Sequence, residues 1–315
     1  MNQQTLNAAR EHWALNDCSI SLVAARENQV YKAEKPEQPL ALRIHRSGYR
    51  SLNEIEAELL WMNMLAEHGV AVPMPVPGVD GSFYLCVDGV TVSALTWLDA
   101  KPWSQLSVNP QMYFELGCEL AKMHTLADAW TLPAGFTRPN WDLVGENPSW
   151  DRFWENPMLT STQAHRLLTF RDAARIAIDQ LEPLDKGLIH ADLIPDNVLY
   201  TTRNELKLID FDDGGFGYRL FDLATITWRC RCIQPDGALA TATVEGYCAN
   251  QNIDNQSIDQ HALRLFEALR ACTYVGWNIT RIDEPSGQQR NVRYIQEAMH
   301  AIEIFSTSFQ SKSMN

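Results

Sequence analysis

Short stretches of strand-like pattern are concentrated in the first third of the chain. Residues 19–25, 29–33 and 40–45 are predicted to be three successive strands. Residues 83–87 and 90–95 follow, and the Asp-Gly pair between them is typical of a tight hairpin turn. The pattern therefore predicts a mostly antiparallel sheet near the N-terminus.

A helix is predicted between the third and fourth of these strands. Residues 51–68 place apolar side chains three or four positions apart, as on one buried face of a helix. Ser51 and Glu54 have the spacing of a capping box, and Gly69 marks the end. The prolines of residues 72–77 then exclude a central strand, because proline lacks the donor that a sheet needs. This stretch is predicted to be an extended connector.

Helical periodicity dominates the rest of the chain. Residues 131–160, which are rich in Pro, Trp and Asn, are expected to be an irregular insertion. The glycine cluster at 214–217 is expected to be a mobile loop. The predicted helices, together with a short one ahead of the sheet, cover residues 3–15, 116–124, 163–182, 223–250, 258–280 and 291–308.

Composition narrows the class of protein. The chain has 315 residues and a formal net charge of −13, which disfavours binding to nucleic acid because phosphate contacts need clustered Lys and Arg. No run of 18 apolar residues suggests a membrane span, and the polar first ten residues have no signal-like core. The seven cysteines are irregularly spaced and are expected to be reduced thiols. We therefore expect a cytoplasmic protein.

Candidate chemistry is concentrated in one stretch. An apolar strand ending at Ile189 leads into a polar loop, and residues 198–200 and 206–209 then read as a short hairpin. Asn197 enters this hairpin and Asp210 leaves it, so the two side chains are predicted to converge. An amide and a carboxylate oxygen suit a hard cation such as magnesium. Asp192, on the loop before them, is placed to accept a proton from a hydroxyl group.

These residues carry a family resemblance. His190-Ala191-Asp192, Asn197 and Asp210-Phe211-Asp212 resemble the catalytic loop and metal motif of protein kinases. Ala at the usual Arg position and Asp at the usual Gly position are similar to the aminoglycoside phosphotransferase and choline kinase-like family. The turn 27–31 and the strand 42–46 look closest to the branch that holds type II homoserine kinase-like and stress response kinase A-like proteins.

The resemblance, which runs from Ser19 to Trp277, implies an α+β fold with two lobes, as in protein kinases. Residues 1–95 are expected to form the nucleotide-binding lobe, with a small antiparallel sheet and one helix. Residues 96–100 would be the hinge, where Thr96, Trp97 and Leu98 offer backbone groups to adenine. Residues 101–315 would form a larger, mainly helical lobe for catalysis and substrate binding.

The family pattern also assigns residues to the nucleotide. Arg43 stands where kinases place a phosphate-binding Lys, and Glu58 is interpreted as its partner on the helix, with Glu54 as the alternative. Asn28 would shape the first turn or meet a phosphate. Asp222 matches a position where an Asp braces the catalytic loop.

The resemblance implies an enzyme that uses ATP and Mg²⁺. Asp192 would be the base, Asn197 and Asp210 would hold the metal, and the acceptor would be a hydroxyl of a small molecule. The acidic charge fits an amine-bearing acceptor. Two alternatives remain at this stage: a kinase of protein Ser/Thr residues, and a nucleotide-binding pseudokinase without turnover.

Overall fold

The structure is a computed structural model, and it describes residues 3–25, 28–141, 152–181, 183–251 and 258–312. Residues 26–27, between the first two predicted strands, and residues 142–151 of the predicted irregular insertion lie outside these ranges. The chain divides into two compact units, which we describe one at a time. The first unit comprises Met1–Ser107, Ala129–Pro139 and Pro195–Gly214, and the second comprises Val108–Asp128, Asn140–Ile194 and Gly215–Asn315.

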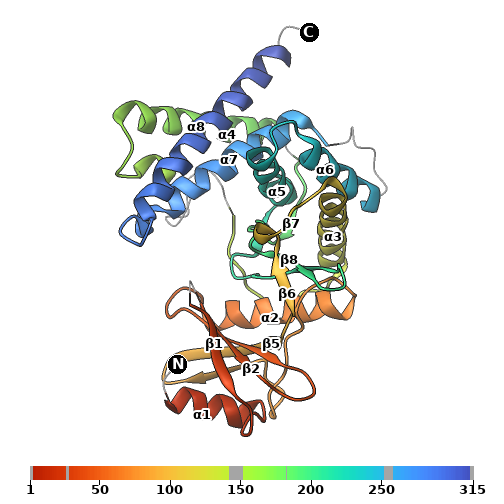
Figure 1. The fold of residues 1–315 in the computed structure, drawn as a ribbon. Helices are drawn as coiled ribbons and strands as arrows, with labels where there is room; N and C mark the ends of the chain where they lie inside the picture. Colours follow the sequence, from red (N-terminus) through yellow and green to blue (C-terminus); the bar gives the residue numbers. More distant parts are fainter. Residues whose placement is uncertain (1–2, 26–27, 142–151, 182, 252–257, 313–315) are drawn as a thin grey trace. The chain divides into compact units, whose positions relative to one another are not determined.

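A five-stranded antiparallel sheet forms the body of the first unit (Figure 1). Asp88 and Gly89 both have positive φ angles (51° and 77°), as the tight turn between its last two strands requires. The predicted strands and the Asp-Gly hairpin are confirmed. In spatial order the strands are β1 (Ile20–Ala25), β2 (Gln29–Ala33), β3 (Leu40–Ile44), β5 (Val90–Thr96) and β4 (Tyr84–Val87).

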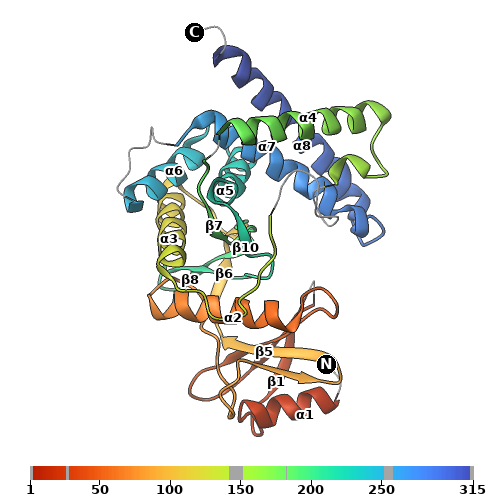
Figure 2. The same cartoon turned by 180° about the vertical axis from the view of Figure 1, so that it is seen from behind.

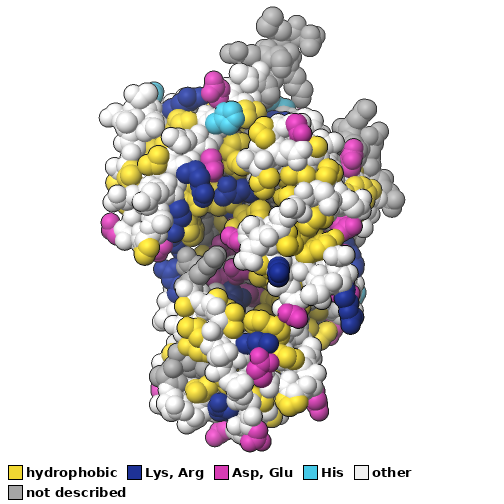
Figure 3. All heavy atoms as spheres, viewed as in Figure 1, with side chains coloured by type: hydrophobic (Ala, Val, Ile, Leu, Met, Phe, Trp, Pro, Cys, Tyr) yellow, Lys and Arg dark blue, Asp and Glu magenta, His cyan; other side chains and the backbone are white. Residues whose placement is uncertain are grey.

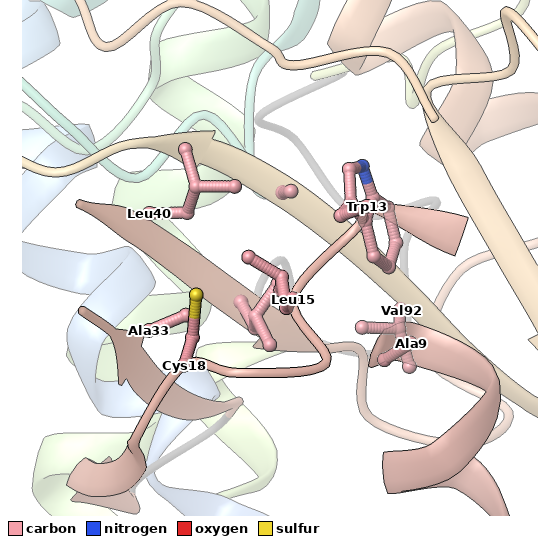
Figure 4. Close-up of a cluster of buried hydrophobic side chains, with 9 residues drawn as sticks. Ala9, Trp13, Leu15, Cys18, Ala33, Leu40 and Val92 are labelled. Atoms are coloured by element: carbon pink, nitrogen blue, oxygen red, sulfur yellow. The ribbon is translucent and has the colours of Figure 1, made fainter. Parts of the chain in front are cut away.

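Helix α1 (Gln3–His12) and the segment after it supply part of the hydrophobic core of this sheet (Figure 4). Trp13 and Leu15 are buried there, and the indole N–H of Trp13 donates to the carbonyl oxygen of Val76 at 2.9 Å. The proline-containing connector of residues 72–77 also meets β5 at an isolated bridge, Pro75 opposite Leu95, but it forms no strand of its own. The buried members of this cluster are Ala9, Trp13, Leu15, Cys18, Ala33, Leu40, Leu42, Val92 and Ala94.

The predicted helix after β3 is α2 (Leu52–Glu67). Ser51 accepts a hydrogen bond from the backbone N–H of Glu54, and the Glu54 carboxylate accepts one from the N–H of Ser51, which completes a capping box. Glu54 is therefore occupied at the start of the helix, whereas Glu58 points inward and is fully buried.

A second, three-stranded sheet completes the first unit. Strand β8 (Val198–Thr201) lies between β6 (Ala100–Pro102) and β9 (Leu206–Leu208), and the short helix η1 (Trp103–Gln105) follows β6. The pairing of β8 with β9 is the hairpin that the sequence predicts. Ala100–Pro102 forms a strand that the sequence did not indicate.

The second unit is mainly helical (Figure 2). Its two strands, β7 (Lys186–Ile189) and β10 (Gly215–Tyr218), pair antiparallel. This confirms the predicted order, in which an antiparallel sheet region precedes a mostly helical remainder. The helices are α3 (Pro110–Ala129), η2 (Phe153–Glu155), α4 (Ser161–Leu181), α5 (Arg219–Ile233), α6 (Ala238–Gln251), α7 (Gln260–Trp277), η4 (Ile279–Arg281) and α8 (Gly287–Lys312).

Two expectations about this unit are wrong. The glycine cluster forms strand β10 rather than a loop, and a Cβ atom at Gly217 would come within 2.5 Å of Ile189, so glycine permits close packing there. The helix predicted over 223–250 is broken into α5 and α6. Pro235, which lacks an N–H group, and Gly237, with φ of 83°, lie at the break.

None of the helices in the described ranges combines the length and the apolar character needed to cross a membrane. The predicted boundaries at residues 95 and 100 remain predictions. The first compact unit contains the nucleotide-lobe residues, and it also contains Pro195–Gly214 from much later in the chain.

Candidate active site

The open end of the β8–β9 hairpin brings the two predicted metal ligands together. Val198 pairs with Leu208, and the next N–H along, that of Ile209, donates to the carbonyl oxygen of Asn197 at 3.0 Å. Asp210 follows directly. Its φ angle of 68° lies in the left-handed region, which Asp tolerates better than most residues. The hairpin thus places Asn197 and Asp210 on neighbouring strand ends, as predicted.

Arg43 connects this hairpin to helix α2. Its Nη1 donates to Glu58 Oε1 at 2.5 Å, and its Nη2 lies 3.3 Å from Asp210 Oδ1 and 3.5 Å from Asp212 Oδ1. The pairing of Arg43 with Glu58 is confirmed, and the alternative partner, Glu54, is excluded by its role in the cap. Burial disfavours the guanidinium charge, but Glu58 and the two aspartates raise the pKa of Arg43 above its ordinary value. Arg43 is therefore a fixed cation beside Asp210.

Asp212 is almost fully buried, unlike Asp210, whose side chain is 48% exposed. Burial alone would raise the pKa of Asp212, but Arg43 and Arg50 outweigh it and hold that pKa below its usual range. Asp212 therefore stays ionised inside the first unit, whereas the side chain of Asp210 is about half exposed to solvent.

Arg138 fixes the backbone that follows Asp210. Its guanidinium donates to the carbonyl oxygens of Phe211, Asp212 and Gly214 at 2.7–2.8 Å. A further bond at 2.8 Å reaches the carbonyl oxygen of Glu54 on α2. One buried side chain thus ties the segment 211–214 to the helix that carries Glu58.

The loop between β3 and α2 holds the same segment from another side. The hydroxyl of Tyr49 donates to Asp213 Oδ1 at 2.7 Å, and Arg50 Nη2 donates to the same oxygen at 3.0 Å. Asn28 also reaches this region, because its amide nitrogen donates to Asp212 Oδ2 at 3.4 Å and its oxygen accepts the N–H of Arg46. These contacts support the turn-shaping alternative for Asn28. A phosphate contact stays a prediction.

The donor set at Asn197 and Asp210 fits magnesium. Both side chains offer oxygen, and the exposed carboxylate of Asp210 is accessible to a cation. Within the described residues there is no group of three or more His, Cys, Asp or Glu that forms a complete metal site. The binding of Mg²⁺ by Asn197 and Asp210 stays a prediction.

Thr96, Trp97 and Leu98, the predicted adenine contacts, lie at the end of β5 and are half-buried. The N–H of Thr96 donates to Met74 O, and the N–H of Trp97 donates to Pro39 O, both at 2.9 Å. These two donors are used inside the protein. The binding of adenine by Thr96, Trp97 and Leu98 stays a prediction.

Asp192, the predicted base, lies in the second unit on the loop after β7. The carboxylate of Asp222 accepts the backbone N–H groups of His190 and Ala191 at 2.7 and 2.6 Å, so the brace predicted for Asp222 is confirmed. Ala191 has a φ angle of 66°, and this left-handed turn lets two successive N–H groups point at one carboxylate. His124 Nε2 donates to Asp222 Oδ2 at 3.0 Å, the same oxygen that accepts the N–H of His190.

Buried Asp222 is an anion at neutral pH. Burial would raise the pKa of Asp222, but the hydrogen bonds from His124 and from the His190 N–H hold it below the usual range. The backbone of the Asp192 loop is therefore anchored to a permanent charge on helix α5. The side chain of Asp192 is 23% exposed, and Arg270 on α7 donates to its Oδ1 at 2.5 Å.

The sequence did not identify four residues of this arrangement as part of the site: Tyr49, Arg50, Arg138 and Arg270. Arg138 lies in the stretch that was expected to be an irregular insertion, and Arg270 lies on a helix far along the chain. No local pattern marks a cation that binds backbone carbonyl groups. For Arg270, the one signal was a charged residue among the apolar positions of a helix, which indicates a buried charge with a partner.

Comparison with known proteins gives one family. A model described as "Phosphotransferase enzyme family" matches residues 19–266. The amicoumacin kinase of Bacillus subtilis is 27% identical over 239 residues, which are 72% of this chain and 68% of that protein. The structure of a microcompartment-associated aminopropanol kinase is 26% identical, covers 100% of this chain and 99% of its own, and has a TM-score of 0.83. An amicoumacin kinase in complex with AMP-PNP and Ca²⁺ has a TM-score of 0.77 over 94% of this chain and 92% of its own, and at 19% identity it supports the fold alone.

Proposed function

The chain belongs to the phosphotransferase enzyme family, and we propose that it transfers the γ-phosphoryl group of ATP, with Mg²⁺, to a hydroxyl group of a small, amine-bearing molecule. The observation that carries this proposal is the buried Arg43–Glu58 pair beside the exposed carboxylate of Asp210. A structural ion pair alone would not need a second, exposed carboxylate, that of Asp210, at 3.3 Å from the same guanidinium.

The residues of the first unit would handle the nucleotide. Asn197 and Asp210 would hold Mg²⁺, which when bound neutralises charge on the phosphate oxygens. Arg43 adds a fixed positive charge next to them, and Glu58 keeps its guanidinium in one orientation. Phosphoryl transfer needs charge neutralisation and alignment more than covalent help from the protein, and these residues supply both.

Asp192 in the second unit would orient the acceptor. Its carboxylate is partly exposed, so it can accept a hydrogen bond from the acceptor hydroxyl. As the acceptor oxygen forms its bond to the γ-phosphorus, the bond from phosphorus to the bridging oxygen of the nucleotide breaks and ADP leaves. The hydroxyl proton passes to Asp192. In-line alignment then contributes much of the rate.

Two observations support a small, amine-bearing acceptor. The chain carries a net charge of −13, which favours a cationic ligand over an anionic polymer. The relatives described above are kinases of small molecules by name, and aminopropanol carries both an amine and a hydroxyl group. A protein Ser/Thr acceptor has no such support.

The test is a screen for ATP consumption by the purified chain. Amino alcohols, hydroxy amino acids, sugars and a generic protein acceptor would be compared, each with and without excess EDTA. We expect metal-dependent turnover with at least one amino alcohol or hydroxy amino acid. Tight nucleotide binding without turnover on any acceptor would instead favour the pseudokinase alternative, and turnover confined to protein would overturn the acceptor class.

A further inference from the structure

Arg270, on helix α7 of the second unit, contacts the predicted base. It lies on α7 (Figure 1), about 80 residues beyond Asp192 in the chain, and its side chain is only 5% exposed. Nη2 donates to Asp192 Oδ1 at 2.5 Å and to the hydroxyl of Tyr274 at 2.8 Å. A charge-assisted bond of this length between a buried cation and a partly exposed anion is among the stronger polar contacts in a protein.

The position of the Arg270 guanidinium is itself fixed by aromatic rings. Its central carbon lies 4.2 Å from the centre of the Tyr274 ring and 5.5 Å from the centre of the Phe221 ring. Cation–π contacts favour this placement, and the side chain is held in a buried environment. Arg270 can therefore act as a rigid support for whatever it binds.

The loop of Asp192 is therefore held both at its backbone and at the carboxylate of Asp192. Asp222 fixes the backbone at His190 and Ala191. Arg270 holds the carboxylate directly. Backbone anchoring alone leaves rotation about the side-chain bonds of Asp192, and a general base loses efficiency when its carboxylate is out of line.

We propose that Arg270 is a positioning residue for the proposed reaction, which holds one oxygen of Asp192 so that the carboxylate meets the acceptor hydroxyl in a fixed orientation. This inference rests on the proposed function of Asp192. A guanidinium on the carboxylate also weakens it as a base. Such weakening is compatible with a loose transition state, in which the hydroxyl needs orientation more than early loss of its proton.

A matched control lies on the same aromatic ring. Arg229 on α5 stands 4.7 Å from the centre of the Tyr274 ring, and its Nη1 lies 3.3 Å from Glu297. It shares the ring with Arg270 and is also largely buried, but its carboxylate partner is Glu297 rather than Asp192. Figure 3 shows Lys and Arg side chains grouped over the face of α7 and α8. The comparison of Arg270→Gln with Arg229→Gln therefore also tests whether any positive charge in this region supports turnover.

The decisive experiment is a double-mutant cycle between Arg270→Gln and Asp192→Asn, with turnover measured in all four proteins. Substitutions of two residues in direct contact are not additive in their effects. We expect Arg270→Gln to lower kcat by about 10- to 100-fold in the native background, with little change in KM for ATP. In the Asp192→Asn background the same change should have less than a threefold effect on kcat.

Further variants separate positioning from folding. Arg270→Lys keeps the charge and should recover part of the lost kcat, whereas Arg229→Gln should leave kcat within about twofold. Circular dichroism and melting temperature are recorded for each protein. If Arg270→Gln does not fold, the cycle is repeated with Arg270→Lys.

The outcomes distinguish the two proposals. An equal loss of kcat in both backgrounds, or an unchanged kcat in a folded Arg270→Gln protein, overturns the positioning role and leaves the proposed function intact. A native protein that consumes no ATP with any acceptor overturns the proposed function, and the positioning role with it.

Discussion

Replacement of Arg138 by Met removes a guanidinium that four backbone carbonyl groups share. The side chain of Arg138 is completely buried, and its bonds to Glu54, Phe211, Asp212 and Gly214 are all 2.7–2.8 Å long. Met has a similar length and fills much of the space, so the lost contacts are mainly polar. The variant therefore isolates the contribution of these bonds to the segment after Asp210.

The expected loss of unfolding free energy follows from the number of carbonyl groups that Arg138 binds and from their burial. Hydrogen bonds to a charged group contribute about 1.5–3 kcal/mol each, so a simple sum over four bonds gives about 6–12 kcal/mol. That sum is too large, because the bonds share one cation and the freed carbonyl groups relax toward other donors. Removal of one partner from a buried ionic arrangement costs about 3–5 kcal/mol, and we expect the free energy of unfolding to fall by that amount. Glu58 keeps Arg43 as a partner, which limits the loss.

Arg138→Lys should give a loss of stability between that of Arg138→Met and zero. An ammonium group keeps the charge near Glu58, but it has three donors and lacks the planar fork that reaches four carbonyl groups. We expect a loss of about 2 kcal/mol, between Met and the native residue.

Urea unfolding followed by circular dichroism measures both variants, and the binding of an ATP analogue with Mg²⁺ is titrated on the same preparations. The control is Arg152→Met, the same substitution at an exposed pair with Glu155, where the cost should stay below about 1 kcal/mol. We expect Arg138→Met to weaken nucleotide binding as well, because it loosens the backbone next to Asp210. A loss of less than about 1 kcal/mol for Arg138→Met, or unchanged nucleotide affinity, would refute the role of Arg138.

Three further predictions use the predicted ligands and a buried histidine. Asp210→Asn removes one charge from the metal site, so turnover should vanish while the melting temperature stays near that of the native protein; full activity in this variant would show that the metal assignment is wrong. Asp192→Asn is nearly isosteric and should lower turnover by about 10²- to 10⁴-fold with little effect on ATP affinity, and near-normal turnover would end the case for Asp192 as the base. Burial, aided by Arg43, lowers the pKa of His45 to about 3, so below pH 6.5 the unfolded chain binds a proton that the folded chain does not. This group should therefore lower the free energy of unfolding by about 1.4 kcal/mol per pH unit as the pH drops from 6.5 toward 3. Urea unfolding at pH 5 and at pH 6.5 measures this effect, and the free energy of unfolding should change less between these two pH values in His45→Gln than in the native protein.

The parts of the site that sequence could predict are those set by local chain geometry. A hairpin of known length fixes the spacing of Asn197 and Asp210, and the capping box at Ser51 fixes the start of the helix that carries Glu58. Each of these features depends on a few neighbouring residues, and the hydrophobic pattern sets the register. The antiparallel pairing of β1 with β2, of β2 with β3 and of β4 with β5 follows for the same reason, because short turns join these strands.

The remainder depends on tertiary contacts that leave no local pattern. Arg138 meets Phe211 across 73 residues of chain, and Arg270 meets Asp192 across 78. The strand at Gly215–Tyr218 was missed because glycine is usually read as a turn former, whereas here the absence of a side chain lets Gly217 pack against Ile189. In each case the residue type is compatible with several environments, and the fold selects one of them.

The contacts within each unit predict which property of the enzyme a substitution in that unit should impair. Arg43, Glu58 and Arg138 act on Asp210 and its following backbone, so damage there should appear first in nucleotide and metal affinity. Asp222 and Arg270 act on the backbone and the carboxylate of Asp192, so damage there should appear in turnover at saturating nucleotide.

Only five positions separate Asp192 from Asn197 in the chain, and both ends of this short segment are anchored, one by helix α5 and one by strand β8. Variants in the two groups should therefore combine additively in free energy if the anchors are independent. Coupling between Arg138→Lys and Arg270→Lys in turnover would instead indicate that the segment 192–197 transmits strain from one anchor to the other.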